Sequence, residues 1–222
     1  MKFDSVNYAI DSSSWTRITN SNGSYADARL FRLASPSAIL TPGAQINSEV
    51  LSTGTSLTMI GYGRNVSSIV TNQYTTGSGA KRQTQTQVRY YEGTTSQMKW
   101  GVNEISGFSN SFESVGFGFY SDVFVTTLYT NKAQALDKDS GGGVFVYDDV
   151  SGKYLLAGIM IGAVRYSDTN GIFAVTDTGN SSLNSKTYSV NLSAYSDQIN
   201  QVIPEPATAV LLVGIGVVFG VV

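Results

Sequence analysis

Short runs of alternating apolar and polar residues, or of β-branched and aromatic residues, recur along the whole chain. Gly, Ser, Asn and Asp separate these runs, which is the pattern of β-strands joined by turns. The connection 148–152 between two of the runs is typical of a hairpin. The pattern predicts strands at Ser5–Ile10, Ala28–Leu33, Ser56–Gly63, Thr84–Tyr91, Val115–Tyr129, Gly143–Tyr147, Lys153–Val164, Gly171–Thr176 and Thr187–Leu192.

Only the segment Ser193–Val202 has a helical pattern. Tyr195, Ile199 and Val202 follow one another at spacings of four and three, which places them on one helix face. Many short strands with a single helix predict an all-β fold, either a sandwich or a barrel. The periodicity by itself does not choose between these two architectures.

The composition narrows the class of protein. The 222 residues are enough for one sizeable domain or two small barrels, and 41% of them are hydrophobic. Only 14% are charged and the net charge is −2, so no basic surface indicates nucleic-acid binding. The chain has no cysteine and no histidine. It therefore lacks a disulfide framework, a thiolate site, and the usual general base near neutral pH.

The loop Asp137–Gly143 contains the strongest candidate chemistry. Ser140 is followed by three glycines, which allow a tight turn and a close approach of the backbone to another group. In such a turn the serine hydroxyl is exposed, and neighbouring N–H groups can form an oxyanion hole. The alternative is an ordinary glycine-rich turn leading into a strand.

The order of several motifs resembles the trypsin-like serine proteases of the chymotrypsin fold. Asp139-Ser140-Gly141-Gly142 is similar to the nucleophile motif, and Asp27–Pro36 is similar to the strand that begins with the catalytic aspartate. Gly61-Tyr62-Gly63 resembles the family's Gly-Trp-Gly. Leu155–Ile159 and Gly171–Phe173 follow in the order of the later strands.

This resemblance implies roles for individual residues. Ser140 and Asp27 would be catalytic, and the backbone N–H groups of Lys138 and Ser140 would hold the oxyanion. Asp139 would shape the loop through a buried ion pair, together with Gly141 and Gly142. The resemblance implies a specificity pocket formed by Gln134, Ile161, Gly162 and Ala163. It implies no metal and no cofactor.

The sequence departs from the family pattern in four respects. Lys138 stands where the family has glycine, and a glycine-only conformation there would be strained for lysine. Ile161-Gly162-Ala163 replaces Ser-Trp-Gly, and Gln134 replaces the aspartate that selects Lys or Arg. Most importantly, no histidine is available to activate Ser140. The chain is therefore expected to be inactive, either because its N-terminus is incomplete or because it is a degenerate homologue.

The resemblance implies a double β-barrel whose first barrel is incomplete. Residues 1–80 would be the remnant of the first barrel, with an open edge. Residues 81–203 would form a closed six-stranded barrel that carries the nucleophile loop and ends in a helix. Residues 204–222 would be a sorting segment.

The last segment resembles a PEP-CTERM sorting signal. Pro204-Glu205-Pro206 precedes an apolar stretch at 207–222, although the usual basic tail is missing. As a helix this stretch would be roughly 24 Å long, a little shorter than the roughly 30 Å hydrocarbon core of a membrane. The resemblance implies export, anchoring in a membrane, recognition by an exosortase-like enzyme, and a location at the cell surface or outside the cell. A buried terminal strand or helix is the alternative.

The sequence therefore predicts an exported serine endopeptidase that acts on a protein or peptide and lacks its histidine. One alternative is a non-catalytic surface or matrix protein derived from a protease. The other is a carbohydrate-binding β-sandwich with a sorting tail, in which two sheets would stack and Ser140 would lie far from Asp27.

Overall fold

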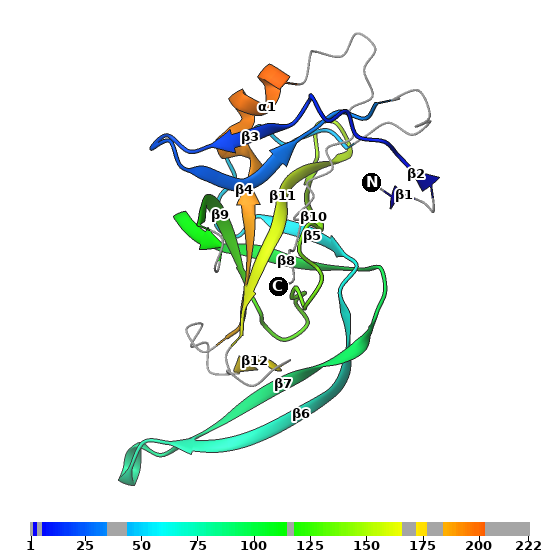
Figure 1. Ribbon diagram of the computed structural model, residues 1–222. Coiled ribbons are helices and arrows are strands. Elements are labelled where there is room, and N and C mark those ends of the chain that lie inside the picture. The colour runs from blue at the N-terminus through cyan, green and yellow to red at the C-terminus, as the bar shows by residue number, and fades with distance from the viewer. Residues whose placement is uncertain are drawn as a thin grey trace.

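A computed structural model describes residues 2–3, 6–34, 44–114, 118–165, 172–176 and 184–202 (Figure 1). Most of these residues are in β-strands, and α1 (Ser196–Val202) is their only α-helix. The all-β class predicted from the strand patterns is therefore confirmed. The motif at 204–206, the apolar segment at 207–222 and the Ser35-Pro36 pair lie outside the described residues.

Six strands form a closed antiparallel barrel. Gly143, at the start of β10, pairs with Ile159 of β11 on one side and with Ile60 of β5 on the other, and this double pairing helps to close the sheet. The closed sheet excludes the stacked sheets of the predicted β-sandwich. The order around the barrel is β10 (Gly143–Asp148), β11 (Lys153–Val164), β13 (Lys186–Asn191), β9 (Phe119–Thr127), β8 (Lys99–Ser114) and β5 (Ser56–Gly61).

A second group of elements packs against the barrel. The hairpin of β3 (Thr16–Thr19) and β4 (Tyr25–Leu30) lies at the top in Figure 1, next to α1. Alternate residues of β4 are buried, as expected for a strand with one face on a core. The shared core contains Ile18, Ala26, Ala28, Leu30, Val123, Ile159, Val190, Leu192, Tyr195 and Ile199. Since hairpin, helix and barrel share this core, they fold as one body.

The predicted division at residue 80 is wrong. Strand β5 precedes that position, yet it pairs with β8 and β10 and completes the barrel. Residue 80 lies in the single-turn 3-10 helix Gly79–Lys81, at the tip of a hairpin. Before β5, the described residues contain only the small sheet of β1 (Lys2–Phe3) and β2 (Val6–Asn7) and the β3–β4 hairpin. No first barrel is present in this described part.

A long β-ribbon extends from the barrel. It consists of β6 (Arg64–Thr76) and β7 (Gln83–Ser96), with β12 (Ile172–Thr176) paired to part of β7. Figure 1 shows it curving below the barrel and projecting past it. The sequence predicted Thr84–Tyr91, which is part of β7, and Gly171–Thr176, which includes β12. Strand β6 was not predicted because its apolar residues Val66, Ile69 and Val70 do not alternate regularly with polar ones, and β7 extends beyond its predicted part.

Candidate active-site loop

The loop that contains Ser140 is a tight turn at the entrance to β10. The N–H of Asp139 donates to the carbonyl of Leu136 (3.1 Å), and the N–H of Gly142 donates to the carbonyl of Asp139 (2.9 Å). The N–H of Gly141 donates to Met160 of β11 (2.8 Å). These three bonds attach the turn to itself and to the barrel wall. The predicted position of Ser140, in a tight loop leading into a strand, is confirmed.

The N–H groups of Lys138 and Ser140 are different from those of their neighbours. In the part of the chain that the structure describes, neither donates a hydrogen bond. These are the two groups that the resemblance assigns to an oxyanion hole. Ser140 is itself partly exposed, so a ligand can reach it. The turn therefore bonds the N–H of Asp139, which lies between them, and leaves the N–H groups of Lys138 and Ser140 available.

Lys138 has a left-handed backbone conformation, with φ of +73°. A side chain in this region costs roughly 1–2 kcal/mol relative to the right-handed region. The strain expected from lysine at a glycine position is therefore present. Gly141, with φ of +86°, has a left-handed conformation in the same turn without a Cβ atom to strain it.

The side chain of Asp139 is buried beneath the turn, with 8% of the residue exposed. Its carboxylate accepts the N–H of Leu136 at 2.9 Å. Burial raises the pKa of Asp139, while hydrogen bonds from the N–H groups of Leu136 and Gly63 and the charge of Lys99 act in the opposite direction. The resemblance implied a buried ion pair here. Among the described residues the carboxylate instead has main-chain donors, and no cation lies within 4.0 Å of it.

Two glycines of β5 and its following turn make room for this carboxylate. A Cβ atom on Gly61 or on Gly63 would overlap with the Asp139 side chain. The sequence indicated only that Gly61-Tyr62-Gly63 ends a strand and resembles a family motif. The structure shows that both glycines are needed so that Asp139 can fold under the loop.

Asp27 lies on a different part of the barrel. Its carboxylate accepts the hydroxyl of Ser114 (2.8 Å), and its N–H donates to the hydroxyl of Ser121 (2.9 Å). Burial raises the pKa of Asp27, opposed by the Ser114 hydrogen bond and the charge of Arg29. Its two serine partners belong to the ends of β8 and β9 that face each other.

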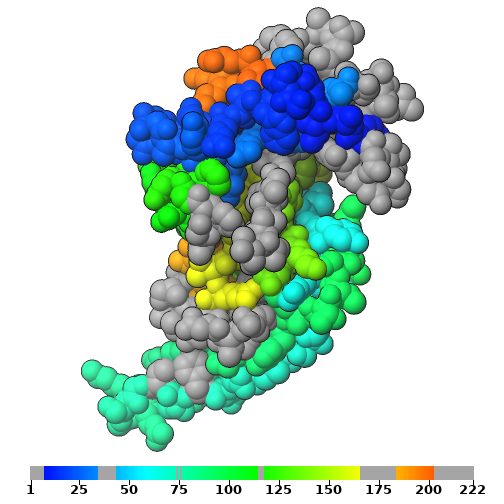
Figure 2. Space-filling view, viewed as in Figure 1, coloured from blue at the N-terminus to red at the C-terminus, as the bar shows by residue number. Residues whose placement is uncertain are grey.

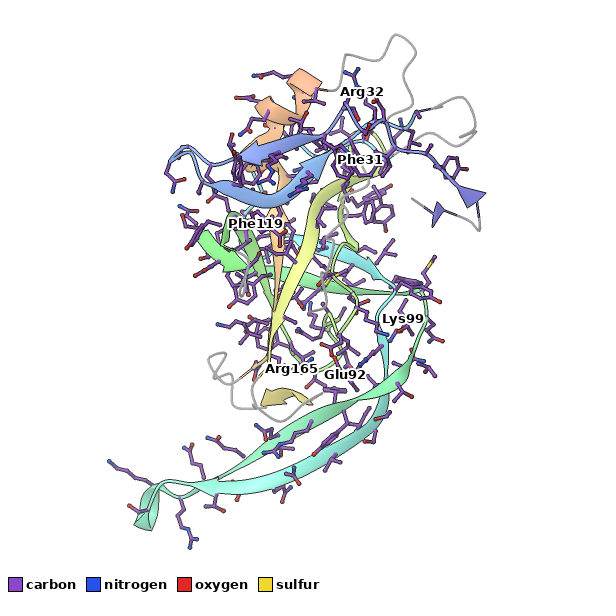
Figure 3. The ribbon with its side chains drawn as sticks, viewed as in Figure 1. Phe31, Arg32, Glu92, Lys99, Phe119 and Arg165 are labelled. Atoms are coloured by element: carbon purple, nitrogen blue, oxygen red, sulfur yellow. The ribbon has the colours of Figure 1, made fainter. Side chains whose placement is uncertain are left out.

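The structure does not bring Asp27 and Ser140 together. The Ser140 loop joins β10 and contacts β11, whereas β9 is three positions from β10 in either direction around the barrel. In Figure 3, Phe119, which pairs with Ser114, and Lys99, whose charge acts on Asp139, lie on opposite sides of the barrel. The prediction that Asp27 faces Ser140 across a cleft is therefore wrong. The order of motifs gives the order of the strands along the chain, but it does not determine where each strand lies around the barrel.

A pocket of about 350 Å³ lies beside the loop. Gln134 and Asp139 line it, together with Lys99 and Trp100 of β8. Of the predicted specificity residues, Gln134 alone lines this pocket. The Ile161 side chain is buried in the core shared by the hairpin, the helix and the barrel. Gly162 has open space beside it, and Ala163 packs against two other hydrophobic clusters. The predicted grouping of these four residues in one pocket is not found.

A cluster of charged side chains joins the loop to the base of the ribbon. The carboxylate of Glu92 accepts the N–H of Asp137 (2.7 Å) and lies 3.8 Å from Arg64 and 3.5 Å from Arg165. Arg165 also forms an ion pair with Asp137. Figure 3 shows Arg165 and Glu92 close to each other between the barrel and the ribbon. Only 2% of the Glu92 side chain is exposed. The sequence analysis missed this cluster because its members are far apart in the chain and match no motif.

No described side chain replaces the missing histidine in an evident way. Lys99, which lines the pocket, donates its ammonium to the carbonyl of Arg64 at 2.5 Å. One of the three N–H groups of this ammonium is thus directed at a main-chain oxygen. Among the described residues, the loop therefore has two unbonded N–H groups, and no side chain forms a hydrogen bond with the Ser140 hydroxyl.

Comparison with known proteins leaves the family open: no family model matches this sequence, and no curated protein matches it either. Within the described residues, no helix is both long and apolar enough to span a membrane. The predicted sorting segment at 204–222 is outside those residues.

Proposed function

We propose that the Asp137–Gly143 loop is the nucleophile loop of a trypsin-like serine endopeptidase domain. In this chain it binds the carbonyl group of a peptide without hydrolysing it at a measurable rate. The observation that carries the proposal is the pair of unbonded N–H groups, on Lys138 and Ser140, on either side of a satisfied Asp139 N–H. Each of these N–H groups belongs to a central residue of a β-turn, 136–139 or 139–142, where it is normally unbonded, so both are open to an external acceptor.

The fold around the loop also supports the proposal. The resemblance implied a closed six-stranded barrel at residues 81–203 that ends in a helix; the barrel around Ser140 is closed, has six strands and precedes a helix, although its strand β5 comes from before residue 81. The strain at Lys138 is the strain expected if this residue holds its N–H in an orientation that the family reaches with glycine.

The chemistry explains why turnover stops. In peptide hydrolysis, the Ser140 oxygen would bond to the carbonyl carbon, and the C=O π electrons would move to the carbonyl oxygen. The two N–H groups would stabilise the resulting oxyanion. The hydroxyl proton must pass to a base, which later protonates the leaving amine. With no histidine in the sequence, imidazole cannot carry this proton in either step.

A non-catalytic surface or matrix protein derived from a protease is the second candidate. The position of Asp27 favours it, because an aspartate on the opposite wall of the barrel cannot orient a base beside Ser140. In either case the motif at 204–206 and the apolar stretch at 207–222 support export and membrane association, with an exosortase-like enzyme as a partner.

Chemical rescue by imidazole tests the proposal. The full chain, kept in mild detergent, is treated with a fluorophosphonate probe with and without a high concentration of imidazole. We expect labelling of Ser140, located by mass spectrometry of peptides, only when imidazole is present. The dissolved imidazole takes the hydroxyl proton while fluoride leaves the phosphorus atom.

Two serine variants control this experiment. Ser140→Ala should abolish the imidazole-dependent label, whereas Ser114→Ala, on the other wall of the barrel, should leave it unchanged. An imidazole-dependent signal that is the same in wild type and Ser140→Ala would refute the endopeptidase proposal and favour the non-catalytic candidate. Strong labelling without imidazole would refute the imidazole-based account and indicate another base.

A further inference from the structure

The outer edge of strand β6 is a long, regular and unpaired strand edge. From Ser68↔Tyr91 to Thr76↔Gln83 its pairing with β7 has no register shift, and the bulges lie nearer the base, between Arg64 and Ser68. In the described residues β6 is the last strand of its sheet, so no strand covers its other side. Figure 2 shows the end of the ribbon standing clear of the rest of the molecule.

This edge lacks the features that normally prevent strand pairing between molecules. Protein edges are usually protected by charges, proline, bulges or short length. Strand β6 has 13 residues, and between 65 and 76 it contains no charged residue, no proline and no glycine. Apolar side chains on this strand are also open to solvent, with Val66, Ile69 and Val70 exposed by 43%, 60% and 39%.

The charges of the ribbon decide how a second strand can approach. Lys81 and Arg82 give the tip a positive charge, whereas residues 65–76 of β6 carry no charge. Two copies aligned in parallel would bring their tips together, and like charges at close range are unfavourable. An antiparallel arrangement places the two tips at opposite ends of the contact.

We propose that two copies of this chain pair through their β6 edges, antiparallel about a two-fold axis near Asn72. The two three-stranded sheets then form one continuous sheet. With Asn72 on the axis, Thr76 of each copy faces Ser68 of the other, so the turn that carries Lys81 lies near the base of the other ribbon. There Asp137, which pairs with Arg64 and Arg165, keeps a side chain that is 44% exposed to the approaching tip.

The two-fold arrangement also explains why the assembly stops at two. An isologous contact uses the same edge of both copies, so neither β6 edge is left to recruit a third. On the opposite side of the sheet, β12 already pairs with β7 from Gln87 to Tyr91. This proposal does not depend on the function proposed for the Ser140 loop.

The absence of cysteine allows a direct test by cross-linking. In the full chain in mild detergent, single variants Val70→Cys, Thr71→Cys, Asn72→Cys and Gln73→Cys each carry the only thiol of the molecule. Residues opposite each other in antiparallel strands have Cα atoms about 4.5–5.5 Å apart, which suits a disulfide. We expect mild oxidation to give a disulfide-linked dimer with a maximum at or beside position 72. Thr94→Cys, on β7, is the matched control and should not cross-link.

Light scattering of the same full chain gives the second readout. We expect the mass of a dimer for wild type and of a monomer for the double variant Ile69→Lys/Gln73→Lys, which places like charges at the centre of the contact. Thr84→Lys/Thr94→Lys adds the same charge to β7 and should remain dimeric, and circular dichroism checks that each variant is folded. A monomeric wild type, equal cross-linking at Thr94→Cys, or open-ended aggregates in place of a dimer would each overturn the proposal.

Discussion

Replacing Lys138 with glycine should stabilise the protein. The backbone of Lys138 has φ of +73°, where a side chain costs roughly 1–2 kcal/mol that glycine does not incur. Glycine loses more backbone entropy on folding, by roughly 0.5–1 kcal/mol. Taken at the midpoints of these two ranges, the difference is a gain of roughly 0.75 kcal/mol in the free energy of unfolding. For a domain of this size, the expected rise in Tm is roughly 1–4 °C.

Thermal unfolding followed by circular dichroism measures this effect, and Lys138→Ala is the matched control. Alanine removes the same charge as glycine but keeps a Cβ atom in the left-handed region. We therefore expect Lys138→Ala to be no more stable than wild type. Gly141→Ala, at φ of +86° in the same turn, should lose roughly 1–2 kcal/mol.

The reasoning about strain would be refuted if the glycine and alanine variants at 138 had equal Tm values, or if Lys138→Gly were clearly less stable than wild type. The same variants bear on the site. Glycine retains the N–H at 138, so Lys138→Gly should keep imidazole-dependent labelling of Ser140 within a few-fold of wild type.

Two further predictions concern buried carboxylates. Burial raises the pKa of Asp139 above its ordinary 3.8, so the folded state binds the proton more tightly than the unfolded state. Between pH 3.8 and the raised pKa, the free energy of unfolding should therefore fall as pH rises. In urea unfolding measured at several pH values, Asp139→Asn should reduce this slope, and the slope that remains should be the contribution of Asp27. An unchanged slope would contradict the burial of Asp139. Glu92→Gln should cost roughly 1–2 kcal/mol in urea unfolding through lost ion pairs, and Glu92→Ala roughly 1–3 kcal/mol more, because the Asp137 N–H loses its acceptor. Equal stability of the two Glu92 variants would show that this hydrogen bond contributes little.

The sequence by itself determined the local features of this protein. Alternation and turn residues indicated the all-β class and the hairpin that joins β10 and β11. The helical spacing indicated that Tyr195 and Ile199 are buried, although Tyr195 ends a 3-10 turn, Leu192–Tyr195, and α1 begins only at Ser196. The glycine run indicated the tight loop at Ser140, and the lysine at 138 indicated strain there. Each of these follows from the conformations open to a few neighbouring residues, so a short window of sequence contains the information.

Tertiary structure decided the pairing of distant segments. It placed β5 in the barrel although β5 precedes the predicted boundary, and it placed Asp27 against Ser114 on the wall opposite Ser140. Tertiary structure also packed the Asp139 side chain against Gly61. It connected the Ser140 loop to the ribbon through charged side chains.

The physical reason is that one strand pattern suits many partners. Period-two alternation says that a strand has a buried face, but the same pattern fits any wall of a closed sheet. Which strands become neighbours depends on closing the barrel and burying one shared core, and these are properties of the whole chain. Whether two candidate catalytic residues come together depends on the same choice of neighbouring strands. The order of motifs along the sequence therefore did not reveal that Asp27 lies away from Ser140.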